Sequence, residues 1–414
     1  MVLLLPARCA DSPMILGLLQ PTTEEKMKEY RRQQKRKREL WGRAKILERR
    51  FSYRWLEQQL FEAERRARRG KTHTTDVYIF ELRLVDNIKQ LAHDIWGYGY
   101  KPTPGIKFVV KRPVPREVYA APFRDRVVHH FLFDLVYPWW DNMFINNSYS
   151  CRYGKGALYG MEMLRRQIRR VSENYTREAY ILKLDVQGFF MSLNHKKLME
   201  RVEWGLDIQF DGAPKLKRLL KYLWRMVIFT DPKEGVRLRG KKSDWDILPP
   251  TKILANQPPG TGIVIGNLTS QLLSNIYMDL LDRYIMYKLK YTNYGRYVDD
   301  FYIVVPAIQK KKLLRDVAKI RDFLKNEMLL TLHPKKLYLQ EVKHGVEFLG
   351  FVVKPYYTMI TKRFKNNFTR AAIEVEWGIR SLDAVASYLG RLKHVDGKKF
   401  AANLFEWVGW EYRF

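Results

Sequence analysis

Two adjacent aspartates interrupt a run of aromatic and β-branched residues in the second half of the chain. Asp299 and Asp300 lie in the stretch YGRYVDDFYIVV, which spans residues 294–305. Side chains alternate between the two faces of a strand, so neighbouring carboxylates cannot share one buried face. Burying two unpaired anions is also costly unless a cation or a tight turn takes them up. We therefore expect a strand, a turn and a second strand, with both acids at the tip of the hairpin.

A third acid, Asp185, ends the apolar stretch AYILKLD, which predicts a strand at residues 179–185. Mg²⁺ prefers oxygen ligands and usually binds through one or two carboxylates together with substrate phosphates. Two such ions about 3.5–4 Å apart stabilise the attacking and leaving oxygens of an in-line phosphoryl displacement. If this strand lies beside the hairpin, the three acids predict two-metal phosphoryl-transfer chemistry. The alternative is a structural ion-pair cluster.

The whole chain carries a large excess of basic residues. It has 75 Lys and Arg against 44 Asp and Glu, which gives a net charge of +31. This excess predicts a polyanionic partner, with nucleic acid the first candidate; a basic protein without such a partner is the alternative. Cys9 and Cys151 form neither a disulfide framework nor a zinc pattern, which favours a reducing compartment. No apolar run approaches the roughly 18 residues of a membrane helix, so we expect no membrane span.

The elements expected around the acids mix helices and strands without strict alternation, which favours an α+β fold. Apolar residues at helical spacing between residues 24 and 70 predict one or two long basic helices, which either bind phosphates or present a solvated face. Residues 1–22 are expected to form a loose terminal extension. In the first half of the chain we further expect a strand, a turn and a strand before a helix that starts near Phe123 or Asp125, and then two helices at 195–227. In the second half we expect an irregular insertion at 231–262, a helix capped by Asn267 or Thr269, a helix at 310–328, and strands near 329–332, 337–339 and 345–353. Roughly the last 50 residues are expected to form a separate helical bundle, and the core is expected to contain Trp139, Trp140, Trp377, Trp407 and Trp410.

Several motifs occur together and in one order between Lys107 and Val353. The motif YVDD within its hydrophobic hairpin resembles the catalytic signature of reverse transcriptases, and LKLDVQGFF resembles the motif that supplies their other metal-binding aspartate. RPVPREVYAAPFRDRVVHH is similar to the fingers motif of the group II intron-like branch. LTLHPKKLYL and GVEFLGFVV resemble the last two palm motifs. The set is far more specific than any one member.

The stretch IGNLTSQLLSNIY, residues 265–277, points to one branch of this family. Most reverse transcriptases carry QGxxxSP at this point, whereas this chain has Ile265 in place of the glutamine and Gln271 in place of the proline. That substitution resembles the reverse transcriptases of diversity-generating retroelements, as do the insertion KKSDWDILPP and the short helical C-terminus. The resemblance implies copying of a template-repeat RNA into cDNA with errors at template adenines. The mutated cDNA then replaces a variable region of a target gene, and a small basic oligomeric accessory variability protein is the usual partner.

The resemblance also implies roles for individual residues. The implied metal site, for two Mg²⁺ ions that Mn²⁺ can replace, consists of Asp185, Val186, Asp299 and Asp300. Lys336 is either a proton donor to pyrophosphate or a lysine that caps a strand, and neighbouring Lys335 leaves the register open. The implied dNTP site consists of Lys111, Arg112, Arg116, Phe189, Phe190, Ile265 and Gln271. The implied nucleic-acid contacts are Arg124, Arg126, Arg152, Lys155 and Tyr297, although Arg124 and Arg126 could instead pair with Asp125.

Three of these positions bear on selectivity. An aromatic ring at Phe190 would exclude a ribose 2′-hydroxyl by its volume, while Phe189 would face the other way; a plain core phenylalanine is the alternative. Arg116 would reach the incoming phosphates with a planar fork of donors. An apolar wall at Ile265 discriminates by only about 1–3 kcal/mol, whereas a hydrogen-bonding site discriminates strongly, so weaker nucleotide selection is expected. The alternative is that Ile265 merely packs.

We therefore predict an α+β, right-hand polymerase that copies template RNA into an RNA–cDNA heteroduplex from dNTPs. The predicted segments are a basic helical N-terminal extension (1–70), fingers with the first palm strands (71–180), palm (181–355) and helical thumb (356–414). A cytoplasmic location in a bacterium, an archaeon or a phage-infected cell goes with this family. The alternatives are a faithful reverse transcriptase of a retron, a defence system or a group II intron-derived element, and a catalytically dead RNA-binding protein.

Overall fold

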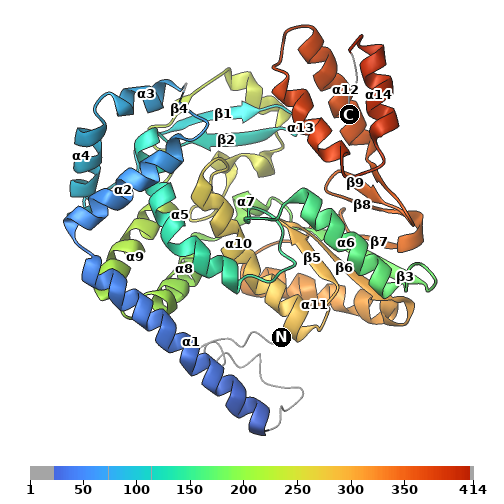
Figure 1. Ribbon diagram of the computed structural model, residues 1–414, viewed down its shortest axis with the longest axis horizontal. Coiled ribbons are helices and arrows are strands. Elements are labelled where there is room, and N and C mark those ends of the chain that lie inside the picture. Colours follow the sequence, from blue (N-terminus) through green and yellow to red (C-terminus); the bar gives the residue numbers. More distant parts are fainter. Residues whose placement is uncertain (1–22, 73, 113, 411–414) are drawn as a thin grey trace. The chain divides into compact units, whose positions relative to one another are not determined.

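The computed structural model describes residues 23–72, 74–112 and 114–410, so the predicted extension at residues 1–22 lies outside the described residues. The described chain mixes helices with small sheets, as predicted (Figure 1). It divides into two compact units, each built from separate stretches of sequence. Unit 1 comprises Met1–Val110, Pro115–Met143 and Phe190–Tyr277, and unit 2 comprises Lys111–Val114, Phe144–Phe189 and Met278–Phe414. The predicted division into four consecutive segments stays a prediction.

Unit 1 begins with the two predicted basic helices, α1 (Thr23–Arg50) and α2 (Tyr53–Arg68). The C-terminal part of α1 is fastened to the N-terminus of α9, because the Glu48 carboxylate accepts hydrogen bonds from the amides of Lys215 and Leu216 at 3.1 and 3.2 Å. A carboxylate at a helix N-terminus satisfies otherwise unpaired amides and favours the helix dipole. The other helices of this unit are α3 (Thr75–Glu81), α4 (Leu84–Trp96), α5 (Phe123–Met143), α8 (His195–Gln209) and α9 (Pro214–Phe229).

The small sheet of unit 1 has the strand order β2–β1–β4. The hairpin of β1 (Ile106–Val110) and β2 (Arg116–Ala120) is the predicted strand, turn and strand. Apart from β4 (Arg237–Leu238), the predicted insertion is a chain of short 3₁₀ turns, η2 (Lys242–Ile247), η3 (Pro250–Lys252) and η4 (Leu254–Asn256). It is attached to β2 by the buried carboxylate of Glu117, which accepts hydrogen bonds from the Trp245 indole and the Leu254 amide, both at 2.7 Å.

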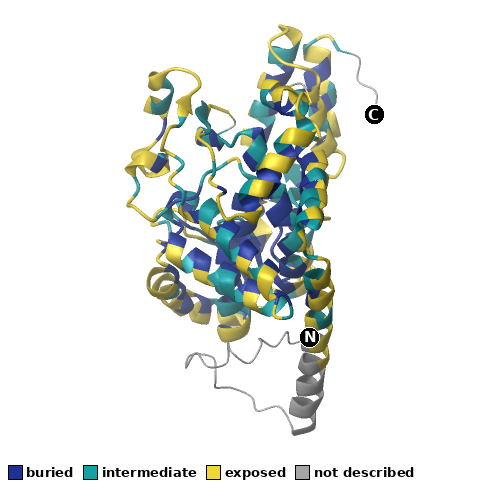
Figure 2. Cartoon of the chain, turned by 90° about the vertical axis from the view of Figure 1, so that its left-hand side faces the viewer, coloured by how far each residue is buried: buried dark blue, intermediate teal, exposed yellow. Residues whose placement is uncertain are grey.

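Unit 2 is built on a four-stranded sheet with the order β5–β6–β3–β7. Its strands are β3 (Ala179–Asp185), β5 (Tyr294–Tyr297), β6 (Asp300–Pro306) and β7 (Tyr338–Glu341), and every neighbouring pair is antiparallel. The helices α6 (Ala157–Val171) and α11 (Lys310–Met328) pack on it through apolar faces. Figure 2 shows helices of the chain with buried residues along one side and exposed residues along the other, the burial pattern of amphipathic helices. The chain passes between the units in the β1–β2 turn, after α5, within α7 (Phe189–Ser192) and within α10 (Leu268–Arg283). The π-helical turn η5 (Tyr284–Lys288) continues α10.

The C-terminal helices α12 (Lys362–Glu376), α13 (Asp383–Leu392) and α14 (Lys398–Trp407) form as predicted, but they are not a separate bundle. Phe368 and Leu404 share one buried cluster with Ile181 and Val304 of the four-stranded sheet, so burial of apolar side chains joins them to it. The small sheet β10–β9–β8, made of β8 (Val346–Phe348), β9 (Phe351–Val353) and β10 (Thr358–Ile360), belongs to the same cluster.

Two smaller predictions were wrong. Trp377 and Trp407 are 72% and 66% exposed, because both end helices on the side away from the core. Residues 329–332 form only an isolated bridge between Leu332 and Val186, since Leu329 ends α11 in a left-handed conformation (φ 53°) and breaks the strand geometry. Within the described stretches, no helix is long and apolar enough to cross a membrane.

Candidate active site

The sheet of unit 2 brings the three predicted acids to one edge. Asp185 is the last residue of β3, and Asp300 is the first residue of β6. The two are direct cross-strand partners, and such partners have Cβ atoms about 4.5–5.5 Å apart on the same face. Asp299 lies in the two-residue turn between Tyr297 and Asp300, which pair with each other. The predicted hairpin and its neighbouring strand are therefore confirmed.

Lys336 completes this cluster. Its ammonium group lies 2.9 Å from Oδ2 of Asp185. The loop that carries it is tied to the end of β3, because the His333 amide donates to the Asp185 carbonyl and the Gln187 amide donates to the Thr331 carbonyl, both at 2.8 Å. Of the two neighbouring lysines, Lys336 is the one whose ammonium group contacts Asp185, and its role in the reaction stays a prediction. The positively charged ammonium group of Lys336 therefore lies beside one of these carboxylates.

The electrostatics of the cluster favour further positive charge. Burial, together with the negative charge of Asp185, raises the pKa of Asp299 to about 6. Burial likewise raises the pKa of Asp300 to about 6, although the nearby Lys183 ammonium opposes the shift. Sequence reasoning missed Lys183. It lies two residues before Asp185 and so on the same face of β3, a spacing that could have identified it.

These residues suit a divalent cation by chemistry. Three carboxylates supply only oxygen ligands, and two of them are held in a setting where their ionised forms repel one another. Among the described residues, no group of three or more His, Cys, Asp or Glu side chains is already arranged as a metal cage. Such sites complete their coordination with waters and substrate phosphates rather than with protein ligands alone. The predicted Val186 is buried and bridges to Leu332.

The turn that carries the acids is strained. Val298 has a φ of 59°, whereas Asp299 is not in the positive range, so Val298 is the residue of this two-residue turn whose backbone conformation favours glycine. A β-branched residue is a genuine outlier there. Such conformations cost about 1–3 kcal/mol and persist only where the surroundings enforce them.

A buried ion pair lies directly beneath this turn. The side chains of Arg296 and Asp282 are fully buried, and Nε and Nη2 of Arg296 each lie 2.7 Å from one Asp282 oxygen. Nη1 of Arg296 donates to the Val298 carbonyl at 2.9 Å. In the sequence, Arg296 is the basic residue nearest to the acids, three positions before Asp299, but no local pattern gives it a partner. The missing signal is spatial, because Asp282 comes from α10.

The predicted nucleotide-binding residues differ in their exposure and in their contacts with other residues. Arg116 begins β2 and is exposed, and its guanidinium makes no hydrogen bond or ion pair with any described residue. Arg112 instead pairs with Glu374 of α12, and Lys111 is exposed beside it. Phe189 is buried and Phe190 is partly exposed, so the two rings differ in exposure, in keeping with their predicted opposite directions.

The two positions that depart from the common reverse transcriptase pattern lie in unit 1. Ile265 is partly buried against Tyr119, Met191 and Leu254, and its carbonyl accepts the Tyr119 amide at 3.0 Å. The side chain thus packs, and it adds no polar group. Gln271 is exposed in the first turn of α10, which begins directly after Asn267 as predicted.

The predicted nucleic-acid contacts are largely engaged within the protein. Arg124 pairs with Asp94 and Asp125, which is the alternative left open, whereas Arg126 pairs with Asp76 rather than Asp125. Arg152 is buried and donates hydrogen bonds to the Ile145 and Ser148 carbonyls, and Lys155 donates to the Asn146 carbonyl. Tyr297 is partly buried and packs against the core of unit 2. Their contacts with nucleic acid stay predictions.

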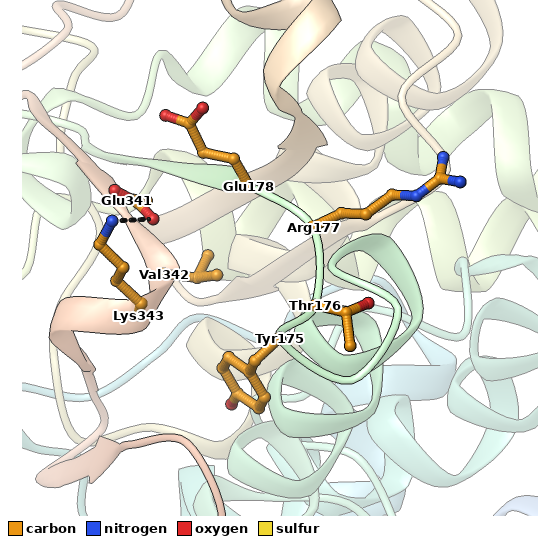
Figure 3. A pocket seen from close by; sticks show the side chains of 7 residues that line it. All are labelled: Tyr175, Thr176, Arg177, Glu178, Glu341, Val342 and Lys343. Atoms are coloured by element: carbon orange, nitrogen blue, oxygen red, sulfur yellow. Dashed lines mark ion pairs between the residues drawn. The ribbon is translucent and has the colours of Figure 1, made fainter.

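Two pockets of the described chain lie away from the acids. A polar pocket of about 290 Å³ in unit 2 is lined by residues 175–178 and 341–343, and Glu341 and Lys343 form an ion pair on one side of it (Figure 3). It lies at the start of β3, at the opposite end of that strand from Asp185. A larger cavity of about 810 Å³ lies within unit 1, and none of the predicted site residues lines it. Neither pocket is lined by Asp185, Asp299 or Asp300, which lie at the ends of the central strands β3 and β6 and in the turn before β6.

Comparison with known proteins agrees with the motifs. The profile of the family described as "Reverse transcriptase (RNA-dependent DNA polymerase)" matches residues 120–353, more than half of the chain and the whole span from β3 to β9. No curated protein matches the sequence.

Two solved structures are among those to which the chain has a low similarity. Telomerase from Candida tropicalis, in complex with a TWJ fragment of telomeric RNA, is 12% identical with a TM-score of 0.46 over 75% of this chain and 56% of its own. The Candida albicans telomerase complex is 11% identical with a TM-score of 0.46 over 80% of this chain and 59% of its own. The chain thus spans less than two thirds of their length, and the assignment rests on the family profile. This chain belongs to the reverse transcriptase family of RNA-dependent DNA polymerases.

Proposed function

We propose that this reverse transcriptase copies a template-repeat RNA into cDNA with adenine-directed errors, as part of a diversity-generating retroelement. Synthesis is supported by the cluster of Asp185, Asp299, Asp300 and Lys336 at one sheet edge. The mutagenic role is supported by Ile265, which stands where most of the family carries a glutamine and packs among apolar side chains. Without an amide at this position, selection among incoming nucleotides is weak. The preference for adenine comes from the family resemblance alone.

In the proposed reaction the three aspartates hold two Mg²⁺ ions, with Mn²⁺ as a substitute. When bound, the ions activate the primer 3′-hydroxyl and neutralise the charge of the transferred phosphate and the leaving pyrophosphate. The carboxylates bind in their ionised form, so cation binding offsets the repulsion that raises the pKa of Asp299 and Asp300. Lys336 then leaves Asp185 and delivers a proton from Nζ to the pyrophosphate.

The remaining assignments follow the right-hand plan. The four-stranded sheet is the palm, the β1–β2 hairpin belongs to the fingers, and α12–α14 form the thumb. Arg116 binds the triphosphate with its free guanidinium, and the partly exposed ring of Phe190 excludes a ribose 2′-hydroxyl. The strong positive charge binds template RNA and the RNA–cDNA heteroduplex chiefly through their backbones. The accessory variability protein is the expected protein partner, and a bacterium, an archaeon or a phage-infected cell is the expected setting.

The test is to sequence cDNA made by the purified protein on a defined RNA with Mg²⁺ and all four dNTPs. A parallel reaction contains the accessory protein and the cognate RNA. Errors concentrated opposite template adenines are expected. Ile265→Gln should lower the error frequency, while Ile265→Leu keeps the apolar wall and should leave it unchanged.

Two alternatives predict different outcomes. A faithful reverse transcriptase would give accurate cDNA in both reactions and no effect of Ile265→Gln. An RNA-binding protein without activity would give no cDNA, and an Asp299→Ala/Asp300→Ala variant would then lose RNA binding rather than synthesis. In the proposed function that variant keeps RNA and loses synthesis.

A further inference from the structure

The strained residue before the catalytic acids is held on both sides. The Val298 amide donates to Oγ of Ser150 at 3.0 Å, and the Val298 carbonyl accepts from Nη1 of Arg296 at 2.9 Å. Both polar backbone groups of this one residue are therefore bound to side chains. The residue that follows is Asp299, so the direction of the acids depends on the conformation at Val298.

The two side chains that hold Val298 are themselves held. Arg296 is fixed in a fork by both Asp282 oxygens, and the Tyr294 hydroxyl donates to Oδ1 of Asp282 at 2.6 Å. A planar guanidinium bound on both its edges has little freedom to rotate. Nη2 of Arg296 also donates to Oγ of Ser148 at 3.1 Å.

Backbone pairing of the preceding residues places Ser150 beside the turn. Residues 147–149 run parallel to β5: the Arg296 amide donates to the Asn147 carbonyl and the Tyr149 amide donates to the Arg296 carbonyl, both at 2.9 Å. This register brings Ser150 level with the turn, two residues beyond Arg296. A segment distant in sequence thus supplies the second side chain that binds the backbone of Val298.

We propose that Ser150 and the Arg296–Asp282 pair act as a positioning clamp for the polymerase reaction. The clamp holds Val298 in the left-handed conformation and so directs Asp299 and Asp300 toward Asp185. These are positioning residues, because they contact the turn and not the substrate. The inference rests on the proposed role of the three aspartates as metal ligands, so its test includes metal binding measured without synthesis.

A double-mutant cycle distinguishes the clamp from ordinary packing. Without the Ser150 hydroxyl, Val298 is free to relax toward negative φ and carry Asp299 away, whereas glycine is stable at positive φ without help. Ser150→Ala should lower kcat about tenfold when Val298 is present, the loss expected for one buried hydrogen bond. The same change should cost less than twofold beside Val298→Gly. The KM for dNTP should stay constant, since the nucleotide-binding residues are untouched.

A second measurement needs no turnover. Mn²⁺ binding to the protein alone, followed by the electron paramagnetic resonance signal of free Mn²⁺, should weaken about tenfold in Ser150→Ala and recover in Ser150→Ala/Val298→Gly. If Ser150→Ala does not fold, Arg296→Lys replaces it in the cycle, because lysine keeps a charge beside Asp282 while losing the planar fork that reaches Val298.

Ser172→Ala is the matched control. The buried Ser172 hydroxyl accepts the amide of Tyr175 at 2.9 Å, and Tyr175 also has a positive φ of 68°. The bond is of the same kind but lies before the start of β3, away from Asp185. This variant should lower thermal stability and leave kcat and Mn²⁺ affinity unchanged.

Equal losses from Ser150→Ala in the wild-type protein and in the Val298→Gly variant would overturn the proposal, since the hydroxyl would then not act through the turn. So would a loss of Mn²⁺ affinity in Ser172→Ala as large as in Ser150→Ala. If Mn²⁺ binding responds as expected while the wild-type protein makes no cDNA, the clamp stands and the proposed function fails.

Discussion

Neutralising one acid of the cluster should stabilise the metal-free protein while abolishing synthesis. The change is Asp299→Asn. The pKa of Asp299 is about 6 in the folded protein, against an ordinary value of 3.8, because burial and the charge of Asp185 disfavour its ionised form. A shift of about two units corresponds to about 3 kcal/mol of unfavourable free energy at neutral pH. Asparagine is also a buried polar group, so a net gain of about 1–2 kcal/mol is expected.

The pH dependence fixes the sign of this effect. Between about pH 4 and pH 6 the folded protein binds a proton at Asp299 that the unfolded chain has already lost. Stability therefore falls as pH rises through this window, and the full penalty is present above it. The advantage of Asp299→Asn should be largest at pH 8 and should disappear near pH 4.

The assay is thermal unfolding in EDTA at several pH values. At pH 8 the melting temperature of Asp299→Asn should exceed that of the wild type by about 1–2 °C, because the unfolding entropy of a chain of 414 residues is large. Mg²⁺ should narrow the difference by stabilising the wild type, because it binds the ionised carboxylates of the folded state.

Asp316→Asn in the same unit is a control of opposite sign. Burial opposes ionisation there too, but hydrogen bonds from Lys312, Lys319 and Tyr291 hold the pKa of Asp316 below its ordinary value. This variant should melt lower than the wild type at pH 8. If Asp299→Asn is no more stable than the wild type in EDTA at pH 8, the electrostatic reasoning about the cluster is wrong.

Three further predictions concern charged side chains. Lys336→Gln should lower kcat about 100-fold with little change in KM for dNTP, and steady-state kinetics showing a change in KM alone would contradict a role in proton transfer. Arg116→Ala should raise the KM for dNTP at least about tenfold while Arg116→Lys restores only part of it, and equal rescue by lysine would argue against a two-pronged phosphate contact. Three arginines of α1 are exposed and make no hydrogen bond or ion pair with any described residue: Arg38, Arg43 and Arg49. Changing all three to glutamine should reduce the slope of the logarithm of the RNA-binding constant against the logarithm of the salt concentration by about two to three. An unchanged slope would assign this helix to a protein partner instead.

The sequence was most informative where a local pattern determines geometry. Alternation along residues 294–305 predicted the hairpin, and an isolated acid at the end of an apolar stretch predicted the neighbouring strand that carries Asp185. Their pairing in one sheet follows from burial of the apolar faces on either side. The spacing of Lys183 and Asp185 would have added a further member of the cluster, since residues two apart share a face.

Long-range contacts were not predictable from the sequence. Arg112 forms an ion pair with Glu374, and Arg296 forms one with Asp282. Both acids come from helices that no local sequence pattern associates with these arginines. The C-terminal helices share the core of the sheet for the same reason: amphipathic faces specify that a partner exists but not which one. Leu329 shows the complementary limit, because β-type side chains at 329–332 predicted a strand and a left-handed helix end prevented it.

Two unfavourable features coincide at the turn that carries Asp299 and Asp300, and together they account for the contacts around it. Directly opposed carboxylates and a β-branched residue at positive φ both weaken the local fold, so relaxation of either would also move the acids apart. The Arg296–Asp282 ion pair, whose side chains are both fully buried, lies beneath this turn rather than elsewhere in the core. A buried ion pair of this kind adds little stability compared with well-packed apolar residues, but it specifies one geometry. Its position is therefore better explained by the need to hold two repelling carboxylates in place than by the stability of the protein.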